Sequence, residues 1–168
     1  MTIQPTTSPT HCETPPSCTI VPAEVGDLES ICRFDLLSLR DYRQREFVAS
    51  AIEEGRCWVA FFDETPVAYG IFNYQFQGYG VIHRVYVSAP YRRRGIGRAL
   101  VDYFGTACSS PRLYITVPQR ELAMLELLRT RGFALSGVVH AIGNEGAALI
   151  YVKDLSSATP PLAGRGLQ

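Results

Sequence analysis

Three arginines and two glycines stand close together in the middle of the chain, where a predicted strand passes into a predicted helix. The segment reads Val85-Tyr86-Val87-Ser88-Ala89-Pro90-Tyr91-Arg92-Arg93-Arg94-Gly95-Ile96-Gly97-Arg98. The first turn of a helix leaves amide N–H groups without intrahelical partners. Glycine lets the backbone come close to an oxyanion, and arginine binds one bidentately. This spacing therefore predicts a site for a phosphate or pyrophosphate.

Two familiar nucleotide-binding motifs do not fit this segment. The chain has no G-x-x-x-x-G-K-[ST] sequence, and Leu100 stands where the dinucleotide fingerprint needs its third glycine. ATP and NAD are therefore disfavoured as ligands. An isolated arginine run is usually a solvated basic face or a nucleic-acid contact, but glycines at a helix start favour an anion site.

Charge is spread unevenly along the 168 residues. Residues 65–101 carry five arginines and no carboxylate, whereas residues 1–32 carry no lysine or arginine. The whole chain balances 16 basic against 16 acidic residues, which argues against a protein that neutralises many phosphates of a nucleic acid. We therefore expect a small anionic ligand near the arginines and no nucleic-acid partner.

The pattern Arg92-x-x-Gly95-x-Gly97, after a strand ending in Val-Tyr-Val, resembles the GCN5-related N-acetyltransferase (GNAT) family. The Arg131-Gly132-Phe133 step is similar to the end of the last helix in that family. The resemblance implies a GNAT-like fold, acetyl-CoA as cosubstrate, an amine as acceptor and a homodimer as one oligomeric state. It also implies coenzyme contacts from a defined set of residues, namely Val85, Val87, Arg92, Arg93, Arg94, Gly95, Ile96, Gly97 and Arg98.

Acyl transfer to an amine needs a base, because the ammonium form must lose a proton before its nitrogen can attack. His83 lies on the strand that would carry the thioester, where several family members have Glu. Its ordinary pKa of about 6.5 suits a base near neutral pH. His83 is therefore the candidate general base, and a packed or hydrogen-bonded strand histidine is the alternative.

The departing thiolate has no obvious proton donor. The family often places a Tyr four residues before the Gly of its final Gly-Phe, and here Leu128 stands at that position. Leucine cannot donate a proton. Tyr114, a weak candidate acid, Tyr86, water or unassisted departure remain as alternatives, and both tyrosines also suit packing in strands.

The folded unit is predicted to span residues 18–155, between a Pro/Thr-rich tail of residues 1–17 and a flexible tail of residues 156–168. Hydrophobic periodicity and turn residues predict an α/β (α+β) fold with a mixed sheet, in the order β-α-α-β-β-β-α-β-α-β-β. Asp27 is predicted to cap the first helix, and residues 42–54 and 119–131 are predicted as later ones. Hairpin turns are predicted at residues 63–66 and 143–146.

Composition excludes several other classes. The chain has no apolar run long enough to span a membrane, and its start lacks the basic and apolar regions of a signal peptide. Its five cysteines and three histidines show neither a disulfide framework nor zinc-ligand spacing. We therefore expect a cytoplasmic protein with no metal and no membrane partner.

Together these features predict an acyl-CoA-dependent N-acetyltransferase that acts on an amine of a small molecule, amino acid or peptide by direct transfer in a ternary complex. A non-catalytic acyl-CoA sensor is the alternative, and Leu128 favours it. Polyamine-acetylating relatives often carry two carboxylates where this chain has His83 and Arg84. An acceptor that carries a carboxylate, or a small neutral amine, is therefore favoured over a polyamine.

Overall fold

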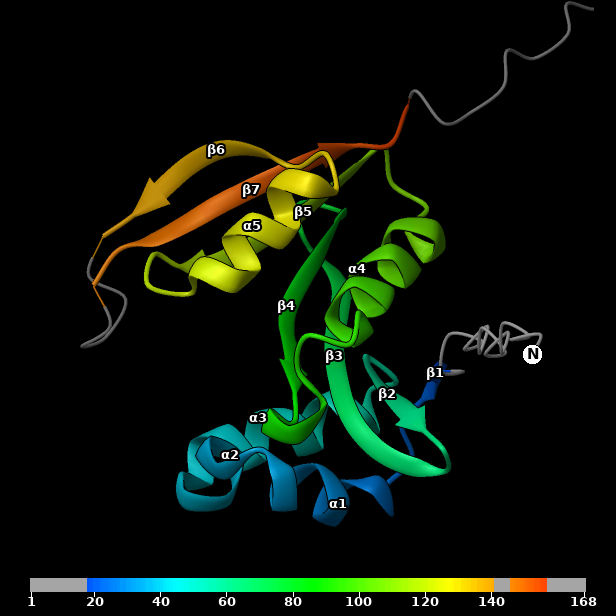
Figure 1. Cartoon of the computed structure of the whole chain (residues 1–168). Helices are drawn as coiled ribbons and strands as arrows, with labels where there is room; N and C mark the ends of the chain where they lie inside the picture. The colour runs from blue at the N-terminus through cyan, green and yellow to red at the C-terminus, as the bar shows by residue number, and fades with distance from the viewer. Residues whose placement is uncertain (1–17, 141–145, 157–168) are drawn as a thin grey trace, which may run out of the picture.

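The computed structural model describes residues 18–140 and 146–156, and their strands form one seven-stranded sheet with helices on both faces (Figure 1). The strand order is β1-β2-β3-β4-β5-β7-β6. Neighbouring strands are antiparallel except β4 and β5, which are parallel. The predicted α/β mixed sheet is confirmed. The predicted tails, apart from Ser156, and turn residues 143–145 lie outside the described residues.

The chain begins with β1 (Cys18–Pro22), followed by α1 (Asp27–Phe34), α2 (Leu36–Arg40) and α3 (Tyr42–Glu53). Helix α2 was not predicted. Asp35 and Asp41 account for the separate helices, because each carboxylate accepts hydrogen bonds from N–H groups at the start of the next one. Asp27 is the first residue of α1 rather than its cap, and its carboxylate accepts a hydrogen bond from the N–H of Glu24.

Strands β2 (Cys57–Phe62), β3 (Thr65–Phe76) and β4 (Tyr79–Val87) form the middle of the sheet, and the predicted β2–β3 hairpin is confirmed. The pairing of β3 with β4 contains a register shift. Ile71 lies opposite Arg84 while Phe72 lies opposite Ile82, which leaves His83 as an extra residue on β4. Such a β-bulge increases strand twist and re-aims side chains, and bulges are common beside active sites.

The second half starts with a short 3-10 turn (Ala89–Tyr91) and α4 (Ile96–Ala107), followed by β5 (Arg112–Pro118). Helix α5 (Leu122–Thr130), β6 (Ala134–Val139) and β7 (Ala148–Asp154) complete the order. Helix α5 begins later than predicted, because Gln119 still belongs to the strand pairing. Its N–H bonds to the carbonyl of Ala147 and so extends the hydrogen bonds between β5 and β7. Within the described ranges, no helix has the length and apolar character needed to cross a membrane.

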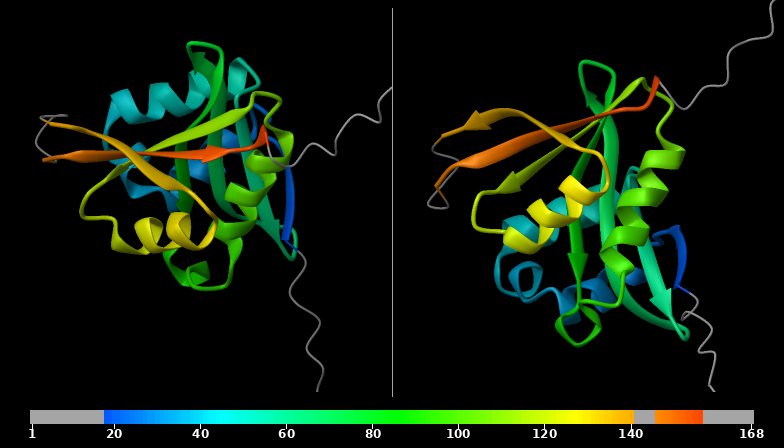
Figure 2. Two further views of the ribbon diagram at one scale, coloured as in Figure 1. Left: turned by 90° about the horizontal axis from the view of Figure 1, so that it is seen from above. Right: turned by 45° about the horizontal axis from the view of Figure 1, so that its top comes forward.

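Two hydrophobic clusters hold the sheet from opposite faces, with α4 and α5 on one side and α1–α3 on the other (Figure 2). Leu100, Phe104 and Leu128 belong to the first cluster, Ile31 and Val48 to the second, and all five side chains are fully buried. Each such side chain contributes about 1.5–3 kcal/mol of hydrophobic stabilisation. Strand β4 therefore has a fixed place between two packed layers.

Candidate active site

Strands β4 and β5 pair over three residues and then separate. The last paired position sets Ile82 opposite Ile115. Beyond it, β4 stays paired with β3 as far as Val87, and β5 stays paired with β7 to its end (Figure 1). In the described part of the chain, the edge of β4 that faces β5 therefore has no strand partner from His83 to Val87. An edge of this kind is a template for an extended ligand that carries amide groups.

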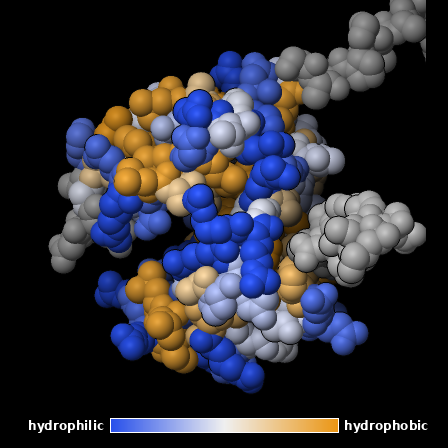
Figure 3. Space-filling view, viewed as in Figure 1, coloured by the Kyte–Doolittle hydropathy of each residue, from blue (hydrophilic) through white to orange (hydrophobic). Residues whose placement is uncertain are grey.

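The surface is hollowed where these strands separate. Figure 3, in the orientation of Figure 1, shows a notch between the part formed by α5, β6 and β7 and the part formed by α1–α3. Hydrophilic residues form a band across the centre of this face, beside the notch. The notch gives solvent access to the region between β4 and β5.

The loop after β4 presents a row of backbone N–H groups. The N–H of Arg92 bonds to the carbonyl of Ala89, and the N–H of Ala99 bonds to the carbonyl of Gly95 at the start of α4. Between these two, the N–H groups of residues 93–98 have no acceptor among the described residues. They lie at the positive end of the helix dipole, which is the arrangement that binds phosphate oxygens.

Two residues with positive φ shape this loop, namely Arg93 at 65° and Gly95 at 82°. Left-handed residues of this kind turn successive N–H groups towards one concavity that binds anions. Gly97 has a different role, because its φ is not positive. A Cβ at this position would meet Val87 Cγ2 at 3.5 Å, an ordinary contact. Glycine at position 97 therefore provides room for an approaching ligand rather than backbone freedom.

Aromatic rings orient the arginine side chains of the loop. The Nε of Arg92 donates to the carbonyl of Val87 at 3.0 Å, and its guanidinium lies 5.7 Å from the centre of the Tyr86 ring. The guanidinium of Arg94 lies 5.4 Å from the centre of the Tyr91 ring. Cation–π contacts orient a charge without neutralising it, so the positive potential remains available to an anion.

The other predicted coenzyme-binding residues divide between core and surface. The side chains of Val85 and Val87 pack against the cluster under α4, and Ile96 is buried there. The side chain of Ile96 is therefore withdrawn from a ligand, whereas Val85 and Val87 are only half-buried. Arg93 and Arg98 are exposed to solvent beside the free N–H groups.

His83 lies in the bulge, next to the point where β4 and β5 separate. Its Nε2 is 2.9 Å from Oδ1 of Asn73, which alternates onto the same face of β3 as Tyr69. The bulge therefore turns both His83 and Arg84 towards the α1–α3 face, whereas neighbouring residues of a regular strand point to opposite faces. Partial burial lowers the pKa of His83 below its ordinary value, and nearby Arg56 lowers it further. The neutral ring that a base requires is thus favoured near neutral pH.

Arg84 belongs to a polar cluster around the carboxylate of Asp35, which is 1% exposed. Asp35 accepts hydrogen bonds from Tyr69 at 2.6 Å and Ser38 at 2.7 Å, and its Oδ2 lies 3.8 Å from Nη1 of Arg84. Arg84 also donates to the Tyr69 hydroxyl at 3.1 Å and to Gln44. The cluster compensates the charge of Arg84 and ties α2 and α3 to β4.

Replacing Tyr69 by phenylalanine should lower the free energy of unfolding by about 1.5–3 kcal/mol, because its hydroxyl bonds to the buried carboxylate of Asp35. Urea denaturation measures this difference. The matched control is Tyr103→Phe, whose hydroxyl has no hydrogen bond among the described residues, and its effect should stay within about 0.5 kcal/mol. Equal losses in the two variants would show that the Asp35 cluster does not stabilise the fold.

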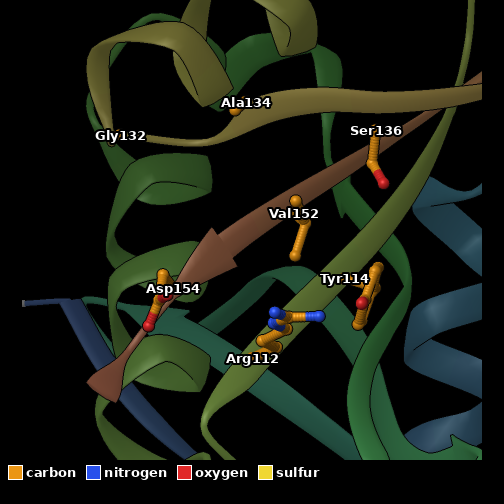
Figure 4. Close-up of a pocket in the computed structure, with 7 residues that line it drawn as sticks. All are labelled: Arg112, Tyr114, Gly132, Ala134, Ser136, Val152 and Asp154. Carbon is orange, nitrogen blue, oxygen red and sulfur yellow. The ribbon is translucent and has the colours of Figure 1, made fainter. Parts of the chain in front are cut away.

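The predicted proton donors are not brought to His83. The Tyr114 ring contacts Phe76 and Tyr79, with centroids 5.1 and 5.8 Å away. The Tyr86 hydroxyl donates to a backbone carbonyl in α1 at 3.2 Å. Tyr114 also lines a pocket of about 410 Å³ on the β5–β7–β6 part of the sheet (Figure 4), together with Arg112, Gly132, Ala134, Ser136, Val152 and Asp154.

Position 128, where the family resemblance leads one to expect a Tyr, supplies no donor either, because Leu128 is fully buried in the cluster under α4. The general acid therefore stays open among water, unassisted departure and a phenol. Within residues 18–140 and 146–156, no group of three His, Cys, Asp or Glu side chains is placed to hold a metal ion.

Strands that separate beside a helix N-terminus rich in free N–H groups are an arrangement suited to an extended anionic ligand, the kind of ligand that acyl-CoA-dependent transferases bind. The sequence profile of the acetyltransferase (GNAT) family matches residues 23–133, which is more than half of the chain. The chain belongs to this family, whose members are generally acyl-CoA-dependent N-acetyltransferases.

Solved structures share this fold. A GNAT-family acetyltransferase from Bacillus cereus ATCC 10987 matches with a TM-score of 0.75 at 21% identity, over 82% of this chain and 97% of that chain. The ribosomal-protein-S18-alanine N-acetyltransferase from Escherichia coli matches with 0.69 at 20%, over 90% and 99%. Arabidopsis thaliana Naa50, in complex with the bisubstrate analogue CoA-Ac-MVNAL, matches with 0.67 at 16%, over 82% and 99%. Comparison with curated proteins gave no match.

Sequence reasoning missed two residues of the candidate site, Asn73 and Asp35. Asn73 is a polar residue at the end of a run of β-branched and aromatic residues, a position where a buried amide usually has a specific hydrogen-bond partner. Asp35 stands at the N-cap position of a short helical stretch, three residues before Ser38. Their contacts with His83 and Arg84 depend on tertiary structure and leave no signal in the sequence.

Proposed function

We propose that this protein transfers an acetyl group from acetyl-CoA to the amine of a small molecule, amino acid or peptide, directly within a ternary complex. The observation that supports this proposal is the unpaired edge of β4. This edge runs from His83 to Val87, towards the free N–H groups of residues 93–98. From residue 83 to residue 87 the edge extends about 13 Å at about 3.3 Å per residue. A pantetheine chain with its pyrophosphate at these N–H groups would run along the edge and bring the thioester towards His83.

In this arrangement His83 removes a proton from the ammonium form of the acceptor. The neutral amine nitrogen then attacks the thioester carbonyl carbon, and the tetrahedral intermediate collapses with cleavage of the C–S bond. As the C–S bond breaks, the nitrogen of the intermediate releases one of its two N–H protons to solvent, which leaves the neutral amide. The coenzyme thiolate is protonated by one of the donors left open above. His83 returns its own proton to solvent, so that the neutral ring is restored.

A second function, an acyl-CoA sensor without turnover, is favoured by the absence of a phenol at position 128, since Leu128 is fully buried. Release of the free coenzyme A thiol separates the two functions. The protein is incubated with acetyl-CoA and a panel of amines, amino acids and peptides, and thiol is measured over time. Release that depends on an amine supports the transferase, whereas binding of acetyl-CoA without release from any member of the panel supports the sensor.

Coenzyme A should stabilise the folded protein, because the N–H groups of residues 93–98 gain acceptors only when a ligand or water is present. At a hundred times its dissociation constant, a ligand adds about 2.7 kcal/mol to the free energy of unfolding. Differential scanning fluorimetry with and without coenzyme A measures the shift. A melting temperature that millimolar coenzyme A leaves unchanged would contradict the proposed anion site.

Amines that carry a carboxylate, or small neutral amines, should be better acceptors than spermidine. Two arginines lie near His83, namely Arg84, which is compensated by Asp35, and Arg56, which is paired with Glu54 at 2.8 Å. The carboxylates of these two pairs are already engaged, so a polycation would lie near two arginines whose partners it cannot easily take. Comparison of kcat/KM across the panel tests this. A higher kcat/KM for spermidine than for every carboxylate-bearing amine would contradict it.

A further inference from the structure

Asn73 has a hydrogen-bonding arrangement that bears on which nitrogen of His83 carries a proton. The side chain is 6% exposed. Its Oδ1 accepts a hydrogen bond from the backbone N–H of Gln75 at 3.0 Å, and its Nδ2 donates to Oε1 of Gln75 at 2.9 Å. The same Oδ1 lies 2.9 Å from Nε2 of His83. One amide oxygen thus lies between a backbone donor and the imidazole.

The backbone N–H of Gln75 fixes the orientation of this amide. Rotating the Asn73 amide by 180° would place its NH₂ group against the N–H of Gln75, so that two donors would face each other. The oxygen therefore points towards both Gln75 and His83. Because an amide oxygen can only accept hydrogen bonds, Nε2 of His83 must be the donor. In the neutral ring, Nδ1 then carries the lone pair.

We propose that Asn73 is a positioning residue that holds His83 in the Nε2–H tautomer, so that Nδ1 is the atom that takes the proton from the acceptor ammonium. This proposal rests on the proposed function of His83 as the base. It adds a role for Asn73 and assigns the reacting nitrogen. The bulge that turns His83 towards the Asn73 face is what makes the contact.

The same hydrogen bond suits both states of the ring. When Nδ1 takes a proton from the ammonium, that N–H bond breaks, its electron pair stays on the amine nitrogen, and the imidazole becomes an imidazolium. Nε2 keeps its proton and its acceptor throughout, so that the ring need not turn during the transfer. After acyl transfer, loss of the proton from Nδ1 to solvent restores the neutral ring.

The charges around His83 set how easily the ring takes that proton. Arg56, between α3 and β2, lowers the pKa of His83 by its charge and is paired with Glu54. Arg84 follows His83 on β4 and is compensated by Asp35. Asn73, from β3, contributes an uncharged oxygen. A carboxylate in place of Asn73 would keep the acceptor and add a negative charge, which favours the imidazolium and raises the pKa of His83.

The tautomer is measurable without any turnover. In full-length protein labelled with ¹⁵N-histidine, long-range ¹H–¹⁵N correlation at pH 8 reports which ring nitrogen is protonated, and a His83→Gln spectrum assigns the signals. We expect the Nε2–H tautomer in the parent protein. The control variant Gln75→Ala should keep it, because the backbone N–H of Gln75 remains and still orients Asn73. An Nδ1–H tautomer, or a mixture, in the parent protein would overturn the proposal.

Two substitutions of Asn73 connect the tautomer to the reaction. Asn73→Leu removes the acceptor, so the single tautomer should be lost and kcat at pH 7.5 should fall roughly tenfold, with coenzyme affinity unchanged. Asn73→Asp should retain the Nε2–H tautomer and move the acidic limb of the pH–rate profile to higher pH. A single Nε2–H tautomer that persists in Asn73→Leu would overturn the proposal. If the leucine variant does not fold, Asn73→Asp decides: an acidic limb of its pH–rate profile at the same pH as in the parent protein would overturn the proposal.

The spectra and the assays can fail separately. A single Nε2–H tautomer in a protein that acetylates no amine would overturn the proposed function and leave the assignment of the tautomer standing. Acetylation by a protein with an Nδ1–H tautomer would support the proposed function and overturn the role of Asn73.

Discussion

Replacing Gly97 by valine should weaken coenzyme A binding by at least about a hundredfold while the protein still folds. Gly97 lies in the first turn of α4, within the row of free N–H groups at residues 93–98. A β-branched side chain there occupies the space through which phosphate oxygens reach these groups. Each hydrogen bond to a charged partner is worth about 1.5–3 kcal/mol, so losing two reduces affinity by two decades or more. Isothermal titration calorimetry measures this change.

The fold should survive the substitution, because a Cβ at Gly97 meets only Val87 Cγ2 at an ordinary 3.5 Å and the backbone has no positive φ there. Gly105→Val is the matched control. It makes the same change in the same helix about 12 Å further along, at 1.5 Å per residue, where a Cβ meets nothing within 4 Å. Equal coenzyme affinity in the Gly97 variant and the parent protein would show that the pyrophosphate binds elsewhere.

Local sequence signals were sufficient for the sheet and for the anion loop. Strands β2 to β5 are rich in β-branched and aromatic residues, and turn residues such as Asp63 and Gly78 separate them along the chain. The loop at residues 92–98 was predictable because free N–H groups at a helix start are a property of any helix. The family match over residues 23–133 agrees with the predicted fold, and anion binding by the loop stays a prediction.

Features that depend on contacts between distant segments could not be predicted. The bulge at His83 arises from the pairing of β3 with β4, and without it the alternation of a regular strand separates His83 from Arg84. The break between α1 and α2 depends on Asp35, whose carboxylate also binds Tyr69, a residue 34 positions later. Hydrophobic periodicity records which side chains are buried, and it contains no information about which polar groups meet.

Replacing His83 by alanine should lower the rate of acetyl transfer at pH 7 by about 10²–10⁴-fold, the usual contribution of a general base. The ammonium form of the acceptor is unreactive, and without His83 only the small fraction of amine already neutral in solution can attack. The rate of the variant should therefore rise about tenfold per pH unit until the amine is deprotonated. In the parent protein, the acidic limb of kcat/KM should lie below the ordinary histidine pKa of about 6.5, because partial burial and Arg56 lower the pKa of His83.

The difference between the two proteins should thus be largest near neutral pH and shrink at high pH, where the amine needs no base. Coenzyme affinity should stay within about twofold, since the N–H groups that would hold the pyrophosphate belong to residues 93–98. His140→Ala is the matched control, because His140 is exposed and lies outside the strands that separate, and its profile should overlay that of the parent. An equal loss of rate at every pH in His83→Ala would show that His83 positions the substrate or supports the fold, and that the ammonium loses its proton to another group.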